Sequence, residues 1–195
     1  NLRTAAKEAS HARIVGVAAR AIRRTGYHGT GVADIMKEAG LTHGAFYAHF
    51  ESREAMLAEA ADRAGAEANA FSTSVIAASP PDQALQAMMQ AYLSTEHRVG
   101  IETGCSISAL CSEMPRQSPE VRRAATRRIK EMIDLVARQL PDWGQPSAHQ
   151  SAMVTVATMI GTLTLARAVN DEALSEAMCS ATLNSLSNKT TKDRG

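Results

Sequence analysis

The chain has 195 residues, nearly half of them apolar, so it can bury a hydrophobic core and is not a disordered segment. Abundant Ala, Leu, Met, Arg, Glu and Gln favour helix throughout. Residues 1–53 carry a net charge of +4 and the remainder carries −3, a distribution typical of a protein that binds a polyanion. No run of about 18 apolar residues occurs, so we expect no membrane-spanning segment.

The N-terminal residues lack the apolar core of a signal peptide. The three cysteines, Cys105, Cys111 and Cys179, form no CxxC pair and no even set. Both features favour a cytoplasmic protein in a reducing compartment over a disulfide framework.

In chain order, apolar residues spaced three and four apart first predict an amphipathic helix from about Ser10 to Thr25, with its arginines mostly off the apolar face. The glycine-rich run 26–31 ends it, and a short helix over 32–39 follows, ended by Gly40. We expect Thr42 to cap a third short helix and Ser52 to cap a fourth that continues to about residue 78.

After the break at Ser79-Pro80-Pro81, the apolar periodicity predicts further helices near 82–98, 104–114, 119–140, 147–169 and 172–187. The separators are rich in Gly, Pro, Asn and Asp. No strand pattern and no internal repeat is present. We therefore predict an all-α fold of about nine helices.

Helices two and three are joined by Ala39-Gly40-Leu41-Thr42, which is the length and composition of a helix-turn-helix. In the segment GLTHGAFYAHF, Phe46 and Phe50 are four apart and are predicted to point inward. The outer side then carries no strong hydrophobe; it consists of Thr42, His43, Gly44, Ala45, Tyr47 and His49. Such a side fits a DNA major groove, with Gly44 allowing close approach and the Ala45 methyl able to contact a thymine methyl.

The block TGVADIMKEAGLTHGAFYAHFESREAMLAEA, residues 30–60, closely resembles the DNA-binding segment of TetR-family repressors. The arginine-rich first helix and the following TGYHGTG match the same pattern. The resemblance implies a three-helix DNA-binding head, a fourth helix that links it to a ligand-binding body, and a homodimer formed by the last two long helices. We expect the boundary near residue 52, giving a helix-turn-helix domain over 1–52 and a ligand-binding and dimerisation domain over 53–195.

The resemblance also implies roles for individual residues. Thr30, Thr42 and Tyr47 match phosphate-binding positions, and His49 matches another position that contacts the DNA backbone. Arg53 matches the position, more often Lys, where the fourth helix meets the backbone. His43 and Ala45 occupy base-reading positions where Lys or Arg and Thr are commoner.

In the body, soft and aromatic side chains indicate a pocket for a small apolar or aromatic inducer. The candidates, each of which is also explained by ordinary core packing, are Met88, Met89, Tyr92, Cys105, Met114, Trp143 and Met159. Buried structural cysteine is the simplest interpretation of Cys105. The Gly104-Cys105 step, however, resembles a subset of the family in which that cysteine senses oxidants or electrophiles.

The eighth predicted helix has no purely polar side, so it has to be covered on all sides. With the ninth helix it is predicted to form a two-fold four-helix interface between two copies of the chain. The residues assigned to this interface are Val156, Ile160, Leu163, Leu174, Met178 and Ala181.

The sequence gives little support for metal binding, catalysis or a cofactor. The histidines lack metal-ligand spacing, no nucleophile and base form a recognisable motif, and no cofactor is expected. The arginine-rich run in the seventh helix is interpreted as a solvated face, with an anionic partner as the alternative. The function that the resemblance implies is a ligand-released repressor that binds a near-palindromic double-stranded operator. The alternatives are an inducer-free activator or nucleoid or cell-division factor of the same fold, and a helical enzyme with a vestigial DNA head.

Overall fold

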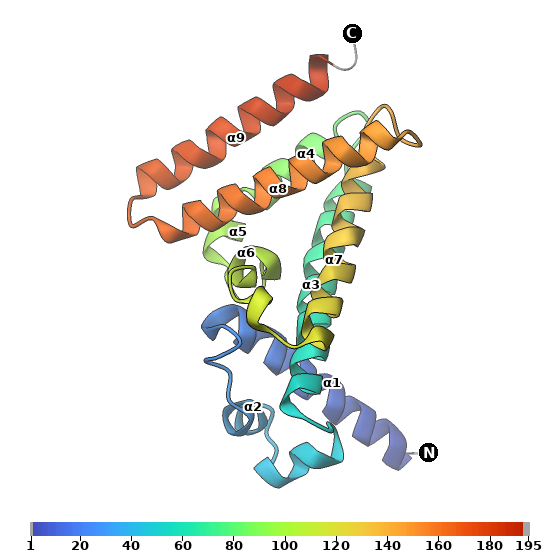
Figure 1. Cartoon of the computed structure of the whole chain (residues 1–195), viewed down its shortest axis with the longest axis vertical. Helices are drawn as coiled ribbons and strands as arrows, with labels where there is room; N and C mark the ends of the chain where they lie inside the picture. Colours follow the sequence, from blue (N-terminus) through green and yellow to red (C-terminus); the bar gives the residue numbers. More distant parts are fainter. Residues whose placement is uncertain (1, 193–195) are drawn as a thin grey trace. The chain divides into compact units, whose positions relative to one another are not determined.

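A computed structural model describes residues 2–192, without the side chains of Leu2 and of residues 189–192. Within this range the chain forms nine α-helices and two short 3₁₀ helices, and no strand (Figure 1). Their bounds are α1 Leu2–Thr25, α2 Val32–Glu38, η1 His43–Ala48, α3 Arg53–Ala77, α4 Ala84–Tyr92, α5 Thr95–Val99, α6 Ser106–Leu110, η2 Met114–Arg116, α7 Pro119–Ala137, α8 Pro146–Ala168 and α9 Glu172–Lys192. The predicted all-α class is confirmed.

Four predicted elements differ in detail. The first helix, expected from about Ser10, begins at Leu2. The helix expected over 82–98 is divided at Leu93, and Ser94 starts α5 by accepting the His97 amide with its hydroxyl at 3.2 Å. The helix expected over 104–114 is shortened to α6, followed by η2. The third helix is 3₁₀, and although Thr42 stands at its N-cap, the Thr42 side chain makes no capping hydrogen bond. Ser52 does cap α3, since its hydroxyl accepts the Ala55 amide at 3.0 Å.

Two compact units divide the chain, and each contains segments distant in sequence. Unit 1 comprises residues 1–67 and 105–128, and unit 2 comprises residues 68–104 and 129–195. Helices α3 and α7 each contribute to both units. These are packing units, and the functional boundary expected near residue 52 stays a prediction.

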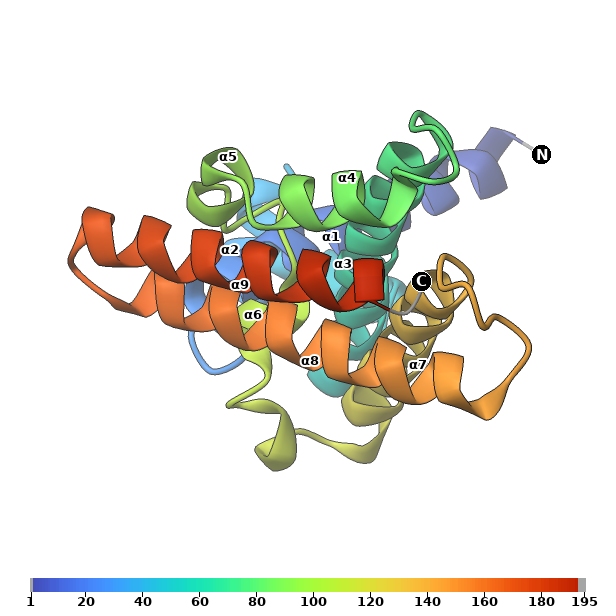
Figure 2. The same cartoon turned by 90° about the horizontal axis from the view of Figure 1, so that it is seen from above.

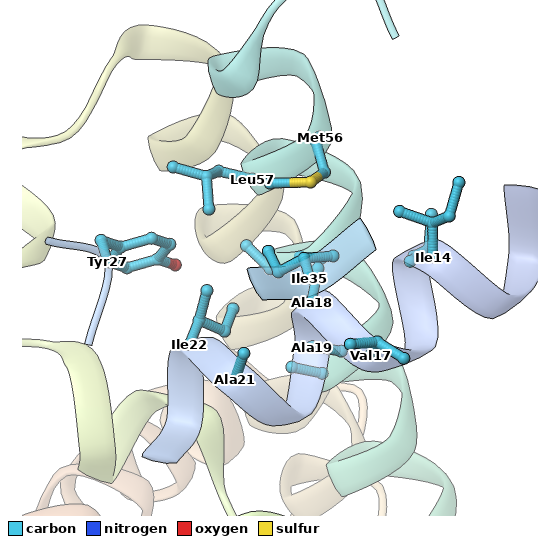
Figure 3. Close-up of a cluster of buried hydrophobic side chains, with 14 of the residues drawn as sticks. Ile14, Val17, Ala18, Ala19, Ala21, Ile22, Tyr27, Ile35, Met56 and Leu57 are labelled. Atoms are coloured by element: carbon cyan, nitrogen blue, oxygen red, sulfur yellow. The ribbon is translucent and has the colours of Figure 1, made fainter. Parts of the chain in front are cut away.

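The core of unit 1 is built on the predicted stripe of α1. Ile14, Ala18 and Ile22 are completely buried, and they pack with residues of α2 and α3 such as Ile35 and Leu57 (Figure 3). Alanines on α1 and α3 keep the helices close together. The arginines of α1 lie mostly off the apolar face, as predicted. The exception is Arg23, which is only 3% exposed because its guanidinium bonds Glu67 of α3 at 2.7 Å and the Ala19 carbonyl at 3.0 Å.

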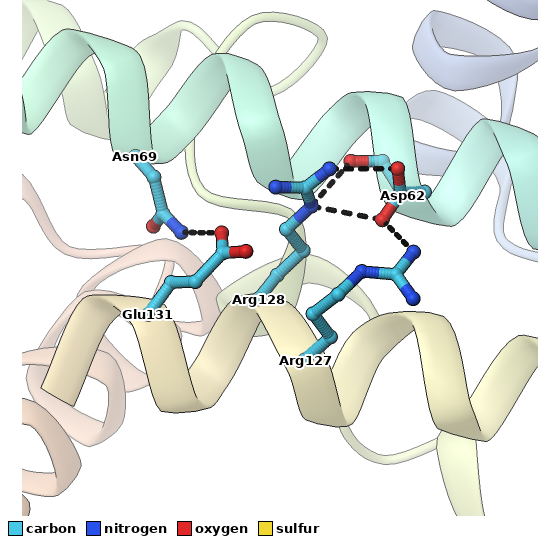
Figure 4. Close-up of polar contacts among 5 residues, drawn as sticks. All are labelled: Asp62, Asn69, Arg127, Arg128 and Glu131. Atoms are coloured by element: carbon cyan, nitrogen blue, oxygen red, sulfur yellow. Dashed lines mark hydrogen bonds and ion pairs between the residues drawn. The ribbon is translucent and has the colours of Figure 1, made fainter. Parts of the chain in front are cut away.

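Helices α3 and α7 are joined within unit 1 by a charged contact (Figure 4). The Asp62 carboxylate accepts from Arg127, and it accepts two bonds from Arg128 at 2.7 and 2.9 Å. Gly65 permits the close approach, because a Cβ there would lie 2.6 Å from the Arg128 Cγ. In unit 2 the same two helices are joined by Asn69, which donates to Glu131 at 3.3 Å.

Unit 2 is organised around α8 and α9, which lie side by side (Figure 2). Their hydroxyls meet at Thr162 and Thr182, 2.8 Å apart, and Ser187 of α9 donates to Gln86 of α4 at 2.6 Å. By length and composition α8 would suffice to cross a membrane, with a mean hydropathy of 1.3 over its most apolar window. The same composition belongs to helices that pack in soluble proteins, so this is weak support for a membrane span.

Candidate nucleic-acid interface

A Schellman turn joins α2 to η1. Gly40 adopts φ +71°, and the Leu41 amide donates to the Met36 carbonyl at 2.9 Å while the Gly40 amide donates to Lys37 at 3.0 Å. The positive φ explains why glycine occupies this position. The predicted helix-turn-helix is thus present in unit 1, with the 3₁₀ helix η1 as its second helix.

The predicted orientation of η1 is confirmed. Phe46 is 2% exposed and Phe50 is 4% exposed, and their rings stack with centroids 5.4 Å apart. Tyr47 points the other way, is 72% exposed and touches Phe46 only at a ring edge. The other residues of the outer side are Thr42, His43 and Gly44, which are exposed, and Ala45 and His49, which are partly buried. The phenylalanines therefore anchor a segment whose polar side remains accessible.

Two residues that the resemblance assigns to DNA contacts also hold the turn between α1 and α2. Thr30 is 2% exposed, and its hydroxyl donates to the Gly26 carbonyl at 2.7 Å. Arg53 donates to the carbonyls of Tyr27 at 2.5 Å and Thr30 at 3.1 Å. The Thr30 hydroxyl is bonded within the turn, and its expected role as a phosphate-binding group stays a prediction. The Arg53 side chain is a third exposed and can contact a phosphate as well as the turn.

His49 lies at the end of η1 in a niche that the sequence did not predict. Burial and the nearby His11 and Lys7 lower the pKa of His49, so its ring is neutral at pH 7. Its Nδ1 is buried and has no hydrogen-bond partner among the described residues. His11 of α1 stacks on Phe50 with centroids 4.5 Å apart and bonds Glu59 of α3 at 2.6 Å. The expected contact of His49 with the DNA backbone stays a prediction.

Unit 2 contains a cavity of about 230 Å³ that the sequence did not predict. It is lined by Ala68, Phe71, Ser94, Glu96, His97, Gly100, Thr103 and Gly104. Burial lowers the pKa of His97 to about 4, with a further contribution from Arg167, so this ring is also neutral at pH 7. Helix spacing gives no signal for this cavity, because most of its lining comes from α5 and the irregular turn that follows.

None of the seven residues assigned to the ligand pocket lines this cavity. Met88, Met89, Tyr92 and Met159 are buried in unit 2, whereas Trp143 is exposed there beside Arg138. Cys105 and Met114 belong to unit 1. The ring of Tyr92 packs edge-on against His97 of the lining, with centroids 4.8 Å apart, and Cys105 follows Gly104 of the lining in the chain. Core packing accounts for the buried methionines, and the assignment of these seven residues to a ligand pocket stays a prediction.

Helices α8 and α9 each have one buried and one exposed side. Two residues assigned to the dimer interface, Val156 and Leu163, are buried within unit 2, so they belong to its core. Ile160 and Met178 are partly buried, and Leu174 and Ala181 are exposed. The exposed side also carries other apolar or small residues; these are Val154, Ala157, Gly161, Leu165 and Ala177.

Two family profiles match the chain. Residues 14–60 match the DNA-binding domain described as "Bacterial regulatory proteins, tetR family", and residues 81–178 match "Transcriptional regulator LmrA/YxaF-like, C-terminal domain". The chain belongs to the TetR family of transcriptional regulators. It is a DNA-binding regulator from a family that is not enzymatic.

Solved structures of TetR-family and related regulators share the fold. The reduced form of NemR from E. coli is 20% identical, covers 92% of this chain and 95% of its own, and gives a TM-score of 0.79. A TetR regulator from Chloroflexus aurantiacus is 24% identical, with coverages of 93% and 96% and a TM-score of 0.78. SCO4454 from Streptomyces coelicolor is 22% identical, with coverages of 93% and 95% and a TM-score of 0.74. No sequence match to a curated protein was found.

Proposed function

We propose that this TetR-family regulator is a ligand-released repressor that binds a near-palindromic operator as a homodimer. The observation that carries the proposal is the outer side of residues 42–47, which is polar and accessible while Phe46 and Phe50 anchor it from within. An exposed segment fixed by buried aromatic rings can enter a major groove without losing its shape. The bacterial family assignment supports a cytoplasmic location.

The outer residues divide by chemistry. The hydroxyls of Thr42 and Tyr47 donate to phosphates, which sets the position of the protein on the duplex but not its sequence preference. His43 and Ala45 face base edges, and Gly44 leaves room for the backbone of η1 to approach. Thr42 suits this role because its hydroxyl is not used as a helix cap.

The homodimer is formed by the exposed sides of α8 and α9 from two copies. Ile160, Leu174, Met178 and Ala181 remain in this proposal, joined by Val154, Ala157 and Gly161. Small and apolar residues on a long exposed face favour close helix packing, and a two-fold arrangement uses the same face twice. Two recognition segments then contact successive major grooves about 34 Å apart.

The ligand occupies the cavity in unit 2. A cavity of about 230 Å³ with Phe71 and His97 in its lining suits a small single-ring aromatic compound, and Ser94 and Thr103 supply hydroxyls to orient it. Glu96 adds a carboxylate to the same lining.

Helix α5, which lines the cavity, is tied to α8 and α9. Arg98 of α5 is buried and bonds Glu172 and, at 2.8 Å, Ser175 of α9. Arg167 of α8 donates to the carbonyls of His97 at 2.8 Å and Arg98 at 3.0 Å. A ligand that displaces α5 would therefore disturb the helices that form the proposed dimer interface.

The test begins with a duplex selected from random DNA by the wild-type protein. Tyr47→Phe is expected to weaken binding to this duplex about fivefold, because one phosphate hydrogen bond is lost, and to leave helicity unchanged. Replacing His43 is expected to change sequence preference more than affinity. Single-ring compounds are then screened for release of the duplex. Unchanged affinity in Tyr47→Phe would refute the assigned DNA contact.

A further inference from the structure

Glu113, which immediately precedes η2, reaches the end of α1, 86 residues away in sequence. Its Oε2 accepts the backbone amide of Tyr27 at 3.0 Å. Tyr27 follows Gly26, which ends α1 with φ +75°. Both partners belong to unit 1, so a segment far along the chain holds the first turn of the DNA-binding head.

Gly26 makes this contact possible in two ways. Its positive φ is readily adopted only by glycine, and a Cβ at this position would lie 2.2 Å from the Oε1 of Glu113. The carboxylate also stands at the C-terminal end of α1, where the helix dipole disfavours negative charge. Stabilisation of α1 therefore does not explain why a carboxylate occupies this place.

A second charged side chain holds the same turn from the other side. Arg53, at the start of α3, donates to the carbonyls of Tyr27 and Thr30, and the Thr30 hydroxyl closes the turn onto Gly26. Helix α2 begins two residues after Thr30, and its N-cap, Gly31, supplies no side-chain cap. The position of α2 thus depends on how residues 26–30 are held.

We propose that Glu113 is a positioning residue for DNA recognition. Its carboxylate fixes the turn between α1 and α2, and through α2 it fixes η1, so a displacement of residues 105–118 changes the affinity for DNA. The contact through which such a displacement acts is the hydrogen bond from the Tyr27 amide to the Glu113 carboxylate. It rests on the proposed function in one respect, namely that the outer side of residues 42–47 binds the operator.

The experiment compares Glu113→Ala, Glu113→Gln and the control Glu120→Ala, which removes an exposed carboxylate from α7 in the same unit. With the selected duplex, Glu113→Ala is expected to bind about tenfold more weakly, within the range typical of coupling between sites. Glu113→Gln keeps an acceptor oxygen, so it is expected to restore most of the affinity. Glu120→Ala is expected to bind as the wild type does.

Hydrogen exchange of the Tyr27 amide and thermal unfolding are measured on the same proteins. Faster exchange in Glu113→Ala alone, with a nearly unchanged unfolding midpoint, supports positioning. The proposal is overturned if Glu113→Ala binds DNA normally while Tyr47→Phe does not. It is also overturned if affinity and unfolding midpoint fall together and Glu113→Gln restores neither. Normal binding by both Glu113→Ala and Tyr47→Phe would overturn the assigned DNA-binding face and this inference together.

Discussion

Two carboxylates in unit 1 hold pairs of arginines, and this sets how stability depends on pH. Glu67 binds Arg63 and Arg23, and Asp62 binds Arg128 and Arg127. Burial raises the pKa of each carboxyl, but the hydrogen bonds and charges of the arginines outweigh it, so both pKa values lie below their ordinary range. Each carboxylate therefore stabilises the folded protein at pH values above its unfolded pKa of about 4. This stabilisation is lost as the pH falls through the lower pKa of the folded state.

Glu67→Gln is therefore expected to make the free energy of unfolding depend less on pH in acid. At pH 7 the free energy of unfolding of the variant should be about 1 kcal/mol lower than that of the wild type. The loss is modest because the Glu67 side chain is a third exposed, although the Arg23 side chain is buried. Below about pH 4 the difference from wild type should shrink. Urea unfolding from pH 7 to pH 3 measures both effects. The exposed Glu8→Gln serves as the control, and a constant difference across this range would contradict the assignment.

Single residues were predictable from the sequence where neighbours on one helix decide their environment. The spacing of Phe46 and Phe50 was enough to predict that both point inward. Arg23 and His49 were not predictable, because their surroundings come from Glu67 and His11 across the fold. Thr30 bonds the carbonyl of Gly26 within one irregular turn, whose geometry helix periodicity does not report. An arginine on a helix is ordinarily solvated, and only the tertiary position of Glu67 makes burial of Arg23 favourable.

The long helices α7, α8 and α9 lie close to their predicted bounds. Helix α1 ends where predicted but begins at Leu2, because the residues before Ser10 continue the helix without the apolar stripe that marks the rest of it. The other exceptions are short. Leu93 and Ser94 divide one predicted helix because Ser94 offers a cap that competes with continuation. Helix α6 has only five residues, and a helix this short is not stable by itself, so tertiary packing decides where it ends. The apolar periodicity also gave no sign of η2.

The turn between α2 and η1 offers a test at this scale. Gly40→Ala is expected to destabilise the protein by about 1–2 kcal/mol, because alanine is strained at φ +71° although the space around it is open. Gly44→Ala meets neither strain nor a neighbouring atom, so its stability should change by no more than about 0.5 kcal/mol. Its affinity for DNA should nevertheless fall, since the methyl group would stand between η1 and the duplex. Chemical denaturation measures the stability of both variants, and duplex titration measures their affinity for DNA. An equal loss of stability in Gly40→Ala and Gly44→Ala would contradict the assigned backbone strain at Gly40.

At the scale of the molecule, the sequence correctly indicated the family and the helical architecture but not the way the chain is divided into packing units. Residues 105–128 pack with the first 67 residues, although they lie beyond the predicted boundary. Contacts such as Glu113 with Tyr27 and Asp62 with Arg128 create this arrangement. They join residues more than 60 positions apart, so no local pattern reports them.

The exposed side of α8 and α9 is expected to control dimerisation. Ala157 lies exposed on α8 among the residues assigned to the dimer interface. Ala157→Asp would place a charge in a closely packed apolar contact between two copies, where desolvation is costly, and it is expected to weaken dimerisation at least tenfold. Ala78 is another exposed alanine of unit 2 that lies outside α8 and α9, and Ala78→Asp should leave the dimer intact. Sedimentation equilibrium measures the association, and duplex titration measures its consequence. A monomer can place only one recognition segment on the operator, so Ala157→Asp should also lose most of its operator affinity. A dimeric Ala157→Asp would place the interface elsewhere.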